Sequence, residues 1–235
     1  MSWNQQSPSY MSADVLAERI SAFLGRVYAW MFLGLAVTAG VALAVSRSAP
    51  LIDALTHNRL VLWIMVLGQL GLVIYLVARV EKMAPATAGA LFLLYSATVG
   101  VTTSVIILAF TGASLVATFM VTAGMFGALA IFGTFTKRSL AGVGQFMFMG
   151  LIGLIIASVV NLFVLSSAVN FVISVIGVIV FTGLTAWDAQ RLKQMAVALP
   201  DGRTGSYAVV GALSLYLDFI NLFFYLLRFM GNRRN

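Results

Sequence analysis

The sequence predicts an all-α polytopic membrane protein, a bundle of seven transmembrane helices with the last helix at its centre. Three observations lead to this prediction. Hydrophobic residues make up 61% of the 235 residues and charged residues only 9%, whereas a soluble domain carries roughly 25% charge. Seven apolar stretches are long enough to cross a bilayer, which takes about 20 residues each. The last stretch carries a polar stripe, which must face protein or water rather than lipid.

The first 26 residues are interpreted as a segment separate from the transmembrane domain, which is expected to cover residues 27–230. Residues 1–11 are polar. Ser12 is a candidate N-cap for a helix that follows it, and apolar residues recur in that stretch at helical spacing. We therefore expect an amphipathic segment that lies at the membrane interface before the first span.

Seven predicted spans follow along the chain. They cover residues 27–46, 60–78, 87–109, 114–135, 143–165, 168–187 and 207–229. The connections at 110–113 and 166–167 are so short that they predict antiparallel helical hairpins, whereas Pro200, Asp201 and Gly202 predict a turn in the longer connection at 188–206. Glycine residues within the spans are expected to allow close helix packing; they include Gly34, Gly40, Gly124, Gly127, Gly150 and Gly153.

Lysine and arginine residues predict how the chain is oriented. Nine lie at the N-terminus and in the loops on its side of the membrane, namely Arg19, Arg26, Arg79, Lys82, Lys137, Arg138, Arg191, Lys193 and Arg203. Five lie on the opposite side, namely Arg47, Arg59, Arg228, Arg233 and Arg234. Because cytoplasmic loops carry an excess of positive charge, the N-terminus is predicted to be cytoplasmic. Seven full crossings then place the basic C-terminus outside; the alternative is a last helix that does not cross completely.

Only two of the seven acidic residues belong to the spans. Asp188 is interpreted as the end of the sixth span, whereas Asp218 lies about 16 Å into the seventh, near the middle of a hydrocarbon core about 30 Å thick. An ionised carboxylate at that depth costs at least about 2.5 kcal/mol on insertion scales. Polar residues and one glycine recur every three or four positions along this helix and share one face. This polar stripe consists of Tyr207, Gly211, Ser214, Asp218, Asn221, Tyr225 and Arg228.

Two carboxylates that approach each other cannot both ionise at low cost, so Asp188 and Asp218 are expected to titrate as a unit if they meet. A shared proton would hold them together and its loss would make them repel, which is a pH-sensitive gate. Once ionised, the pair is also a candidate calcium site, because carboxylate oxygens suit a hard cation. Arg79 is the candidate counter-ion of Asp188. The alternative is that Asp218 is a buried polar residue satisfied by Asn221 and a neighbouring helix.

Two stretches of the chain resemble a known family. LYLDFINLF followed by LLR, with an aspartate ending the preceding span, resembles the Bax inhibitor-1 (transmembrane Bax-inhibitor-motif) family in its bacterial branch, and FLGRVYAWMFLGLAVTAG resembles the opening motif of that family. The similarity runs from about residue 20 to residue 230. It implies a last helix surrounded by the other six, a bacterial inner or plasma membrane location, and a pH-sensitive calcium leak controlled by two aspartates. That pair maps onto Asp188 and Asp218, with Trp187 where tyrosine is common in the family.

Three functions were compared. The first is a passive calcium (cation) leak, for which the lipid bilayer, calcium ions and protons are the expected partners. The second is a regulatory protein that binds a membrane protease or a stress-response partner. The third is an intramembrane aspartyl protease, but the sequences AWDAQ and LYLDF lack the Tyr-Asp and Gly-x-Gly-Asp motifs of such enzymes. We therefore expect no enzymatic activity, no cofactor other than calcium as a permeant or bound ion, and no nucleic-acid partner.

Overall fold

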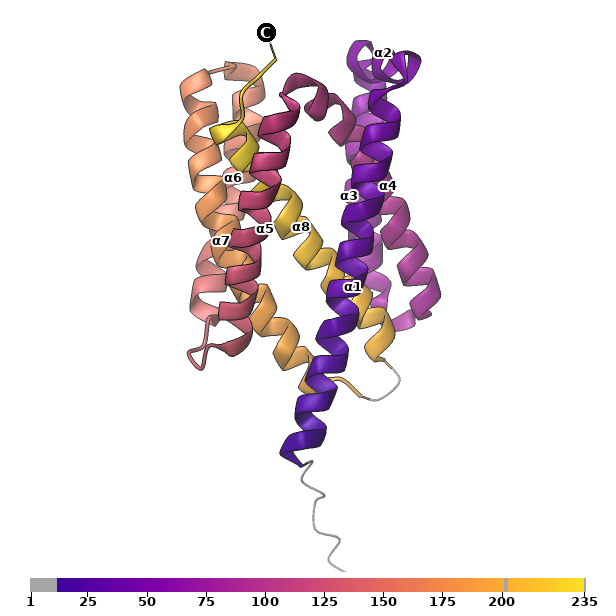
Figure 1. Cartoon of the computed structure of the whole chain (residues 1–235), viewed down its shortest axis with the longest axis vertical. Helices are drawn as coiled ribbons and strands as arrows, with labels where there is room; N and C mark the ends of the chain where they lie inside the picture. Colours follow the sequence, from indigo (N-terminus) through magenta and orange to yellow (C-terminus); the bar gives the residue numbers. More distant parts are fainter. Residues whose placement is uncertain (1–11, 201–202, 235) are drawn as a thin grey trace, which may run out of the picture.

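A computed structural model describes residues 12–200 and 203–234, which form a helical bundle (Figure 1). Its elements are α1 (Ala13–Ser46), α2 (Ala49–His57), α3 (Arg59–Arg79), the 3-10 turn η1 (Val80–Lys82), α4 (Pro85–Ala109), α5 (Gly112–Phe135), α6 (Ala141–Val164), α7 (Ser167–Ala198) and α8 (Thr204–Met230). Seven of the described helices are long and apolar enough to span a membrane, which confirms the predicted fold class. The remaining helix, α2, is nine residues long and was not predicted.

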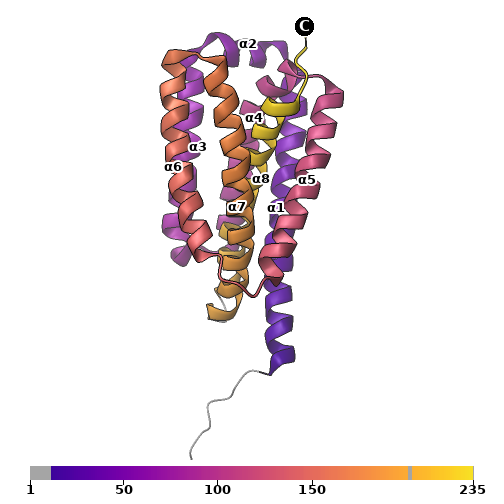
Figure 2. The ribbon, with the colours of Figure 1, turned by 90° about the vertical axis from the view of Figure 1, so that its left-hand side faces the viewer.

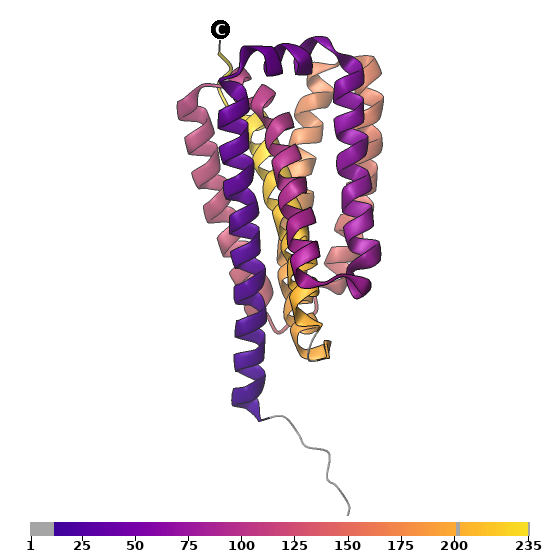
Figure 3. The same cartoon turned by 90° about the vertical axis from the view of Figure 1, so that its right-hand side faces the viewer.

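The two ends of the bundle are easily told apart. α2 and the C-terminal residues lie at one end, which we call the outer end, and the start of α1 lies at the opposite, inner end (Figures 1 and 3). α8 runs between the two ends, so the chain makes seven crossings and the alternative of an incomplete last crossing is wrong.

α1 differs from the expected separate interfacial segment, because it is one helix of 34 residues. Ser12 caps it by accepting a hydrogen bond from the Val15 N–H (3.4 Å). Figure 2 shows its first turns continuing straight past the rest of the bundle at the inner end. The N-terminal part of α1 contacts the rest of the bundle directly. Arg19 donates a hydrogen bond to the Leu199 carbonyl, and Arg26 donates one to Thr204 Oγ1 (3.4 Å). These contacts tie the start of α1 to the connection between α7 and α8.

α8 lies at the centre of the bundle. In its most apolar 18-residue stretch 56% of the residues are buried, against 6% for the span containing α3 and 11% for α6. It packs against α1, α4, α5 and α7. The family resemblance implied six surrounding helices, and the structure gives α8 these four principal neighbours, with α3 and α6 farther out. α8 lies at the centre because most of its surface is apolar, and its apolar side chains pack against those of its neighbours.

Close helix packing depends on only two of the six glycines named from the sequence, and on others that were not named. A Cβ added at Gly34 would lie 2.4 Å from the Phe92 ring, and one at Gly150 would lie 3.0 Å from Val180. The other four have nothing within 4 Å of such an atom; they are Gly40, Gly124, Gly127 and Gly153. Two further glycines make the closest approaches, since a Cβ at Gly133 would lie 2.0 Å from the Ala186 carbonyl oxygen and one at Gly144 would overlap the Trp187 ring. They bring α5 and α6 against the part of α7 that carries Asp188.

Candidate functional site

The antiparallel packing of α7 and α8 places the two span aspartates at similar depth. α7 continues to Ala198, so the prediction that Asp188 ends its span is wrong; Asp188 lies about 15 Å from the end of the helix at 1.5 Å per residue. Asp218 lies about 21 Å from the start of α8 at Thr204. The two helices are packed neighbours joined by a short connection. The extra length of α7 is therefore what brings Asp188 level with Asp218.

Gln190 and Lys193, two polar residues beyond Asp188, help to account for the length of α7, because each has a partner at the end of α5 or in the connection that follows it. The Gln190 side chain accepts a hydrogen bond from the Leu140 N–H (2.8 Å) and donates one to the Arg138 carbonyl (2.8 Å). Lys193 Nζ donates to the Thr134 carbonyl (2.8 Å). These bonds keep the last residues of α7 helical, although the hydrophobic pattern of the sequence ends before them.

Both aspartates line one cavity of about 590 Å³. Asp188 is 9% exposed and Asp218 is 5% exposed, and they are close enough to interact electrostatically. Ser214, Asn221 and Tyr225 of the polar stripe line the same cavity. Its walls on the side facing away from α8 are formed by α3 and α6. The middle of the stripe therefore borders a cavity rather than packed core. The loose placement of α3 and α6 around α8 is what leaves room for it.

The remaining members of the stripe lie outside this cavity. At the inner end, Tyr207 Oη donates a hydrogen bond to Glu81 Oε1 (3.1 Å). Gly211 lets Leu192 of α7 approach, since a Cβ there would lie 2.5 Å from the leucine side chain. A second cavity of about 30 Å³, large enough for about one water molecule, is lined by Asp188 and Gly211 on the inner side of the first. Arg228 lines a different cavity at the outer end.

Asp218 has an unusual environment for a residue with a purely structural role. Its Oδ2 atom is buried and has no hydrogen-bond partner among the described residues. Asn221 Nδ2 donates instead to the Leu217 carbonyl of its own helix (2.8 Å). The alternative in which Asn221 satisfies Asp218 is therefore not what the structure shows. Because a buried polar atom without a partner is costly, the arrangement favours a proton or a cation at this carboxylate.

The charged neighbour of Asp188 is Arg191, whose Nη1 atom lies 4.0 Å from Asp188 Oδ1. Arg191 also lies over the Trp187 ring, at 5.5 Å from its centroid. Arg79, the counter-ion predicted from the sequence, is exposed at the end of α3, and no ion pair joins it to Asp188 in the described part of the chain. The sequence could have indicated the Asp188–Arg191 pair through its spacing, since residues three apart in a helix are neighbours on its surface.

An aromatic pair lines the cavity on the side toward the outer end. The rings of Tyr225 and Phe181 stack with centroids 5.8 Å apart and an interplanar angle of 26°. Gly177 lies beneath Tyr225, and a Cβ there would lie 2.6 Å from the tyrosine ring. We call these three residues the aromatic plug. Along α7 and α8 it lies between the residues that line the cavity containing the aspartates and those that line the outer cavity with Arg228.

The site offers few metal ligands. No group of three or more His, Cys, Asp or Glu residues that could hold a metal ion occurs in residues 12–200 and 203–234. A stable calcium site takes 6–8 oxygen ligands, whereas the cavity offers two carboxylates with the polar side chains of Ser214, Asn221 and Tyr225. This donor set suits a brief contact with a passing cation better than a stored ion. His57 lies elsewhere, in α2, with its Nδ1 2.9 Å from Asp53.

Comparison with known proteins identifies the family. A family model described as "Inhibitor of apoptosis-promoting Bax1" matches residues 20–235. The chain belongs to the Bax inhibitor-1 family. The match covers every helix that borders the aspartate cavity, so the site lies in the part of the chain that defines the family.

Relatives of this Bax inhibitor-1 family member are bacterial proteins, and two of those named below are described as membrane proteins. It is 46% identical to the inner membrane protein YbhL of Escherichia coli K12 over 218 residues, which cover 92% of this chain and 93% of the relative. It is also 46% identical to a protein of Borreliella burgdorferi over 215 residues, 91% and 93% of the two chains. A membrane protein of Streptococcus pyogenes serotype M1 is 37% identical over 225 residues, 94% and 96% of the two chains. With seven apolar helices long enough to span, the chain is a multi-pass protein of the bacterial inner membrane.

Proposed function

We propose that the protein is a passive cation leak, with calcium the preferred ion, and that protonation of the Asp188–Asp218 pair closes it. One observation carries the proposal: a buried carboxylate oxygen of Asp218 has no hydrogen-bond partner among the described residues, and Asp188 lines the same cavity. Charged residues inside a membrane typically mark ion or proton pathways. The cavity, the polar stripe and the membership of the family all support this function.

The pair acts as a gate because of its charge. While the two carboxylates share a proton, a hydrogen bond between them favours the packed arrangement of α7 and α8. When that proton is lost, two like charges in a poorly screened interior repel each other and favour separation of the helices. The other charged or titratable side chains that line the cavity are Arg191, Tyr95 and Tyr225. Arg191 favours the ionised form of Asp188 and so favours opening.

Cation selectivity is expected from the same two residues. Acidic side chains along a route concentrate cations and exclude anions, and conduction requires that each ion be bound weakly enough to leave. Two carboxylates with a few neutral oxygens meet both conditions for a hard divalent cation. The aromatic plug lies on the outer side of the residues that line the cavity, which is where we expect the closed state to block the route.

The test is calcium flux into liposomes that contain the purified protein and a calcium-sensitive dye, measured at acidic, neutral and alkaline pH. Wild-type flux is expected to rise with pH. Asp188→Asn and Asp218→Asn remove the repulsion, so flux in both variants is expected to stay low at alkaline pH, about tenfold below wild type for each 1.4 kcal/mol of repulsion lost. Asp53→Asn is the control, because Asp53 is exposed in α2 and does not line the cavity.

Flux from these liposomes also separates the leak from the regulatory alternative. A protein that acts only by binding a membrane protease or a stress-response partner would pass no calcium when it is the only protein present. Curves that are identical for wild type and for both aspartate variants would remove the gate from the proposal.

A further inference from the structure

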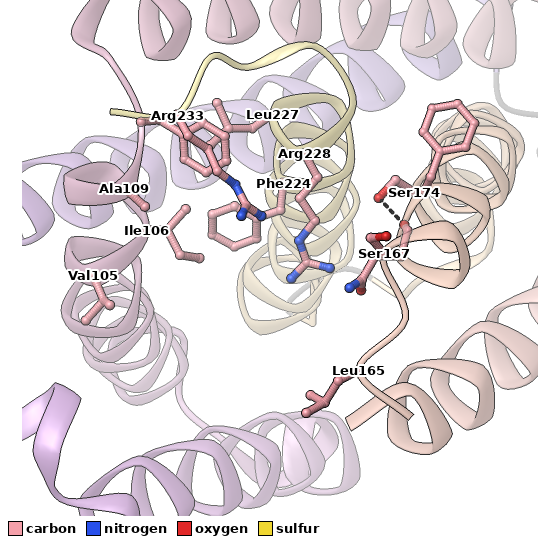
Figure 4. Close-up of a pocket in the computed structure, with 13 residues that line it drawn as sticks. Val105, Ile106, Ala109, Leu165, Ser167, Ser174, Phe224, Leu227, Arg228 and Arg233 are labelled. Atoms are coloured by element: carbon pink, nitrogen blue, oxygen red, sulfur yellow. Dashed lines mark hydrogen bonds between the residues drawn. The ribbon is translucent and has the colours of Figure 1, made fainter. Parts of the chain in front are cut away.

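A second large cavity lies at the outer end of the bundle, away from the aspartates. Its volume is about 720 Å³. The ends of α4 and α8, the start of α7 and the C-terminal tail (residues 231–234) enclose it. Figure 4 shows Arg228 of α8 and Arg233 of the tail directed into the same space, with Ser167 of α7 beside it. Neither the gate nor the aromatic plug uses this cavity.

Arg228 and Arg233 make the cavity positively charged. Among the described residues no carboxylate lines it, and neither arginine forms an ion pair. At the outer end the carboxylate of Asp53 is already paired with His57 at 2.9 Å. Ser167 and Asn170, in the first turn of α7, add neutral polar groups to the lining. The surface therefore presents two guanidinium groups to whatever enters.

Backbone hydrogen bonds fix the position of Arg233. The Thr111 N–H donates to the Asn232 carbonyl (3.1 Å), and the Arg234 N–H donates to the Ala109 carbonyl (3.0 Å). The Asn232 N–H donates to Ser114 Oγ (2.9 Å). Residues on both sides of Arg233 are thus bonded to the connection between α4 and α5. A tail that served only as a loose basic end would not need these three bonds.

Arg228 is held on the other side of the cavity. Its guanidinium lies over the Tyr225 ring, 5.9 Å from the centroid, and its position in the last turn of α8 is favourable for the helix dipole. The dipole alone explains a basic residue here, but it does not explain why a second arginine is brought to the same cavity from the tail. Two pre-positioned guanidinium groups are a typical arrangement for binding a phosphate.

We propose that this outer cavity binds an anionic phosphate group between Arg228 and Arg233. The same chemistry is offered by the headgroup of an anionic phospholipid and by free inorganic phosphate. The remaining lining is largely apolar, with Phe110, Phe171 and Phe224 among its side chains. Basic residues on the outer side also run against the usual bias of lysine and arginine toward the cytoplasm, and a bound anion supplies a physical reason for them.

The experiment has one arm for each source of phosphate. In the first arm, the full-length protein in phosphatidylcholine nanodiscs is dialysed against radiolabelled inorganic phosphate. In the second arm, detergent-solubilised protein is mixed with phosphatidylglycerol or with phosphatidylcholine, and retained lipid is counted by native mass spectrometry. Wild type is compared with Arg228→Gln, Arg233→Gln and Arg234→Gln. Arg234 is the matched control, because it is the next residue of the same tail but does not line the cavity.

Binding in either arm is expected to weaken about tenfold in Arg228→Gln and in Arg233→Gln, as for loss of one charged hydrogen bond, and to persist in Arg234→Gln. The melting temperature without ligand should change little in any variant, with a small fall in Arg228→Gln from the lost contact with Tyr225, since the side chains of these arginines are exposed. The proposal is overturned if wild type binds neither ligand, or if Arg234→Gln loses binding as much as the other two. Phosphatidylglycerol retention alone would identify a lipid headgroup as the ligand, and phosphate binding alone a free anion.

Discussion

Asp218 has one buried carboxylate oxygen without a hydrogen-bond partner in the described structure, while Asp188 beside it has Arg191 at 4.0 Å. The two carboxylates of the gate are therefore not equivalent. Asp188 can be ionised next to its arginine, whereas Asp218 has no cation of its own on the cavity wall. The shared proton is expected to reside mainly on Asp218, and the charge on Asp188 is expected to depend on Arg191.

This difference gives a prediction for Arg191→Gln. Removing the guanidinium makes ionised Asp188 less favourable, so the pair keeps its proton to a higher pH and the leak should open at higher pH than in wild type. Calcium flux in liposomes across a pH series measures the displacement of the curve. Arg79→Gln is the matched control, because Arg79 is also at the inner end of a helix but has no ion pair with Asp188 in the described residues. An equal displacement in both variants would contradict the assignment of Arg191.

At the scale of helices, the aromatic plug lies between the two large cavities along α8. Its packing depends on Gly177, because a Cβ there would lie 2.6 Å from the Tyr225 ring. α7 and α8 can therefore approach closely at this level only with glycine at position 177. A movement of either helix that shifts Tyr225 would join the cavities.

Gly177→Ala is expected to displace Tyr225 and so to raise calcium flux at acidic pH, where wild type is closed. Overpacking of this kind costs about 1–3 kcal/mol, so the melting temperature should fall as well. Gly153→Ala is the control, since a Cβ there has nothing within 4 Å and alanine stabilises a helix by about 0.5–1 kcal/mol relative to glycine. Acidic flux that is unchanged in Gly177→Ala despite a lower melting temperature would show that the plug does not close the route.

The helices also show what could be predicted from the sequence. The seven spans and the face shared by Ser214, Asp218 and Asn221 followed from hydrophobicity and from the spacing of polar residues, both of which are local. The true end of α7 was not predicted, because Gln190 and Lys193 find their partners in the connection after α5 and at the end of α5, 50 and 59 residues earlier in the chain. Long-range contacts of this kind leave no periodic signal.

The ion pair of Asp188 and the contacts of the C-terminal tail were likewise not predicted from the sequence. The sequence favoured Arg79 as the counter-ion because it lies at the end of a span. The charged partner of Asp188 is instead Arg191, one helical turn away. Arg233 of the tail reads in the sequence only as a basic residue, because its meeting with Arg228 at one cavity depends on hydrogen bonds between Thr111, Asn232 and Ser114. Sequence spacing indicates which residues share a helix face, but it does not indicate which faces meet.

At the scale of the whole molecule, the bundle has an acidic cavity in its interior and a basic cavity at its outer end. This asymmetry matters only if the outer end faces away from the cytoplasm, as the distribution of lysine and arginine predicts. The chain has no cysteine, so single cysteines can report the orientation without background. Arg234 and Lys137 are exposed at opposite ends of the bundle.

Labelling with a membrane-impermeant maleimide should therefore modify Arg234→Cys in intact spheroplasts and leave Lys137→Cys unmodified until the membrane is permeabilised. The opposite pattern would show that the aspartate cavity opens toward the outside and the arginines toward the cytoplasm. Equal labelling of both before permeabilisation would indicate damaged membranes, and a cytoplasmic cysteine in a soluble reporter protein controls for this.

The most direct test of the central claim is the pH dependence of calcium flux in wild type, Asp188→Asn, Asp218→Asn and the double variant. If the two carboxylates act as one gate, either single substitution abolishes the rise of flux with pH, and the double variant behaves like the singles. If each single variant keeps half of the pH response and the double variant loses all of it, the aspartates titrate independently and the account is contradicted.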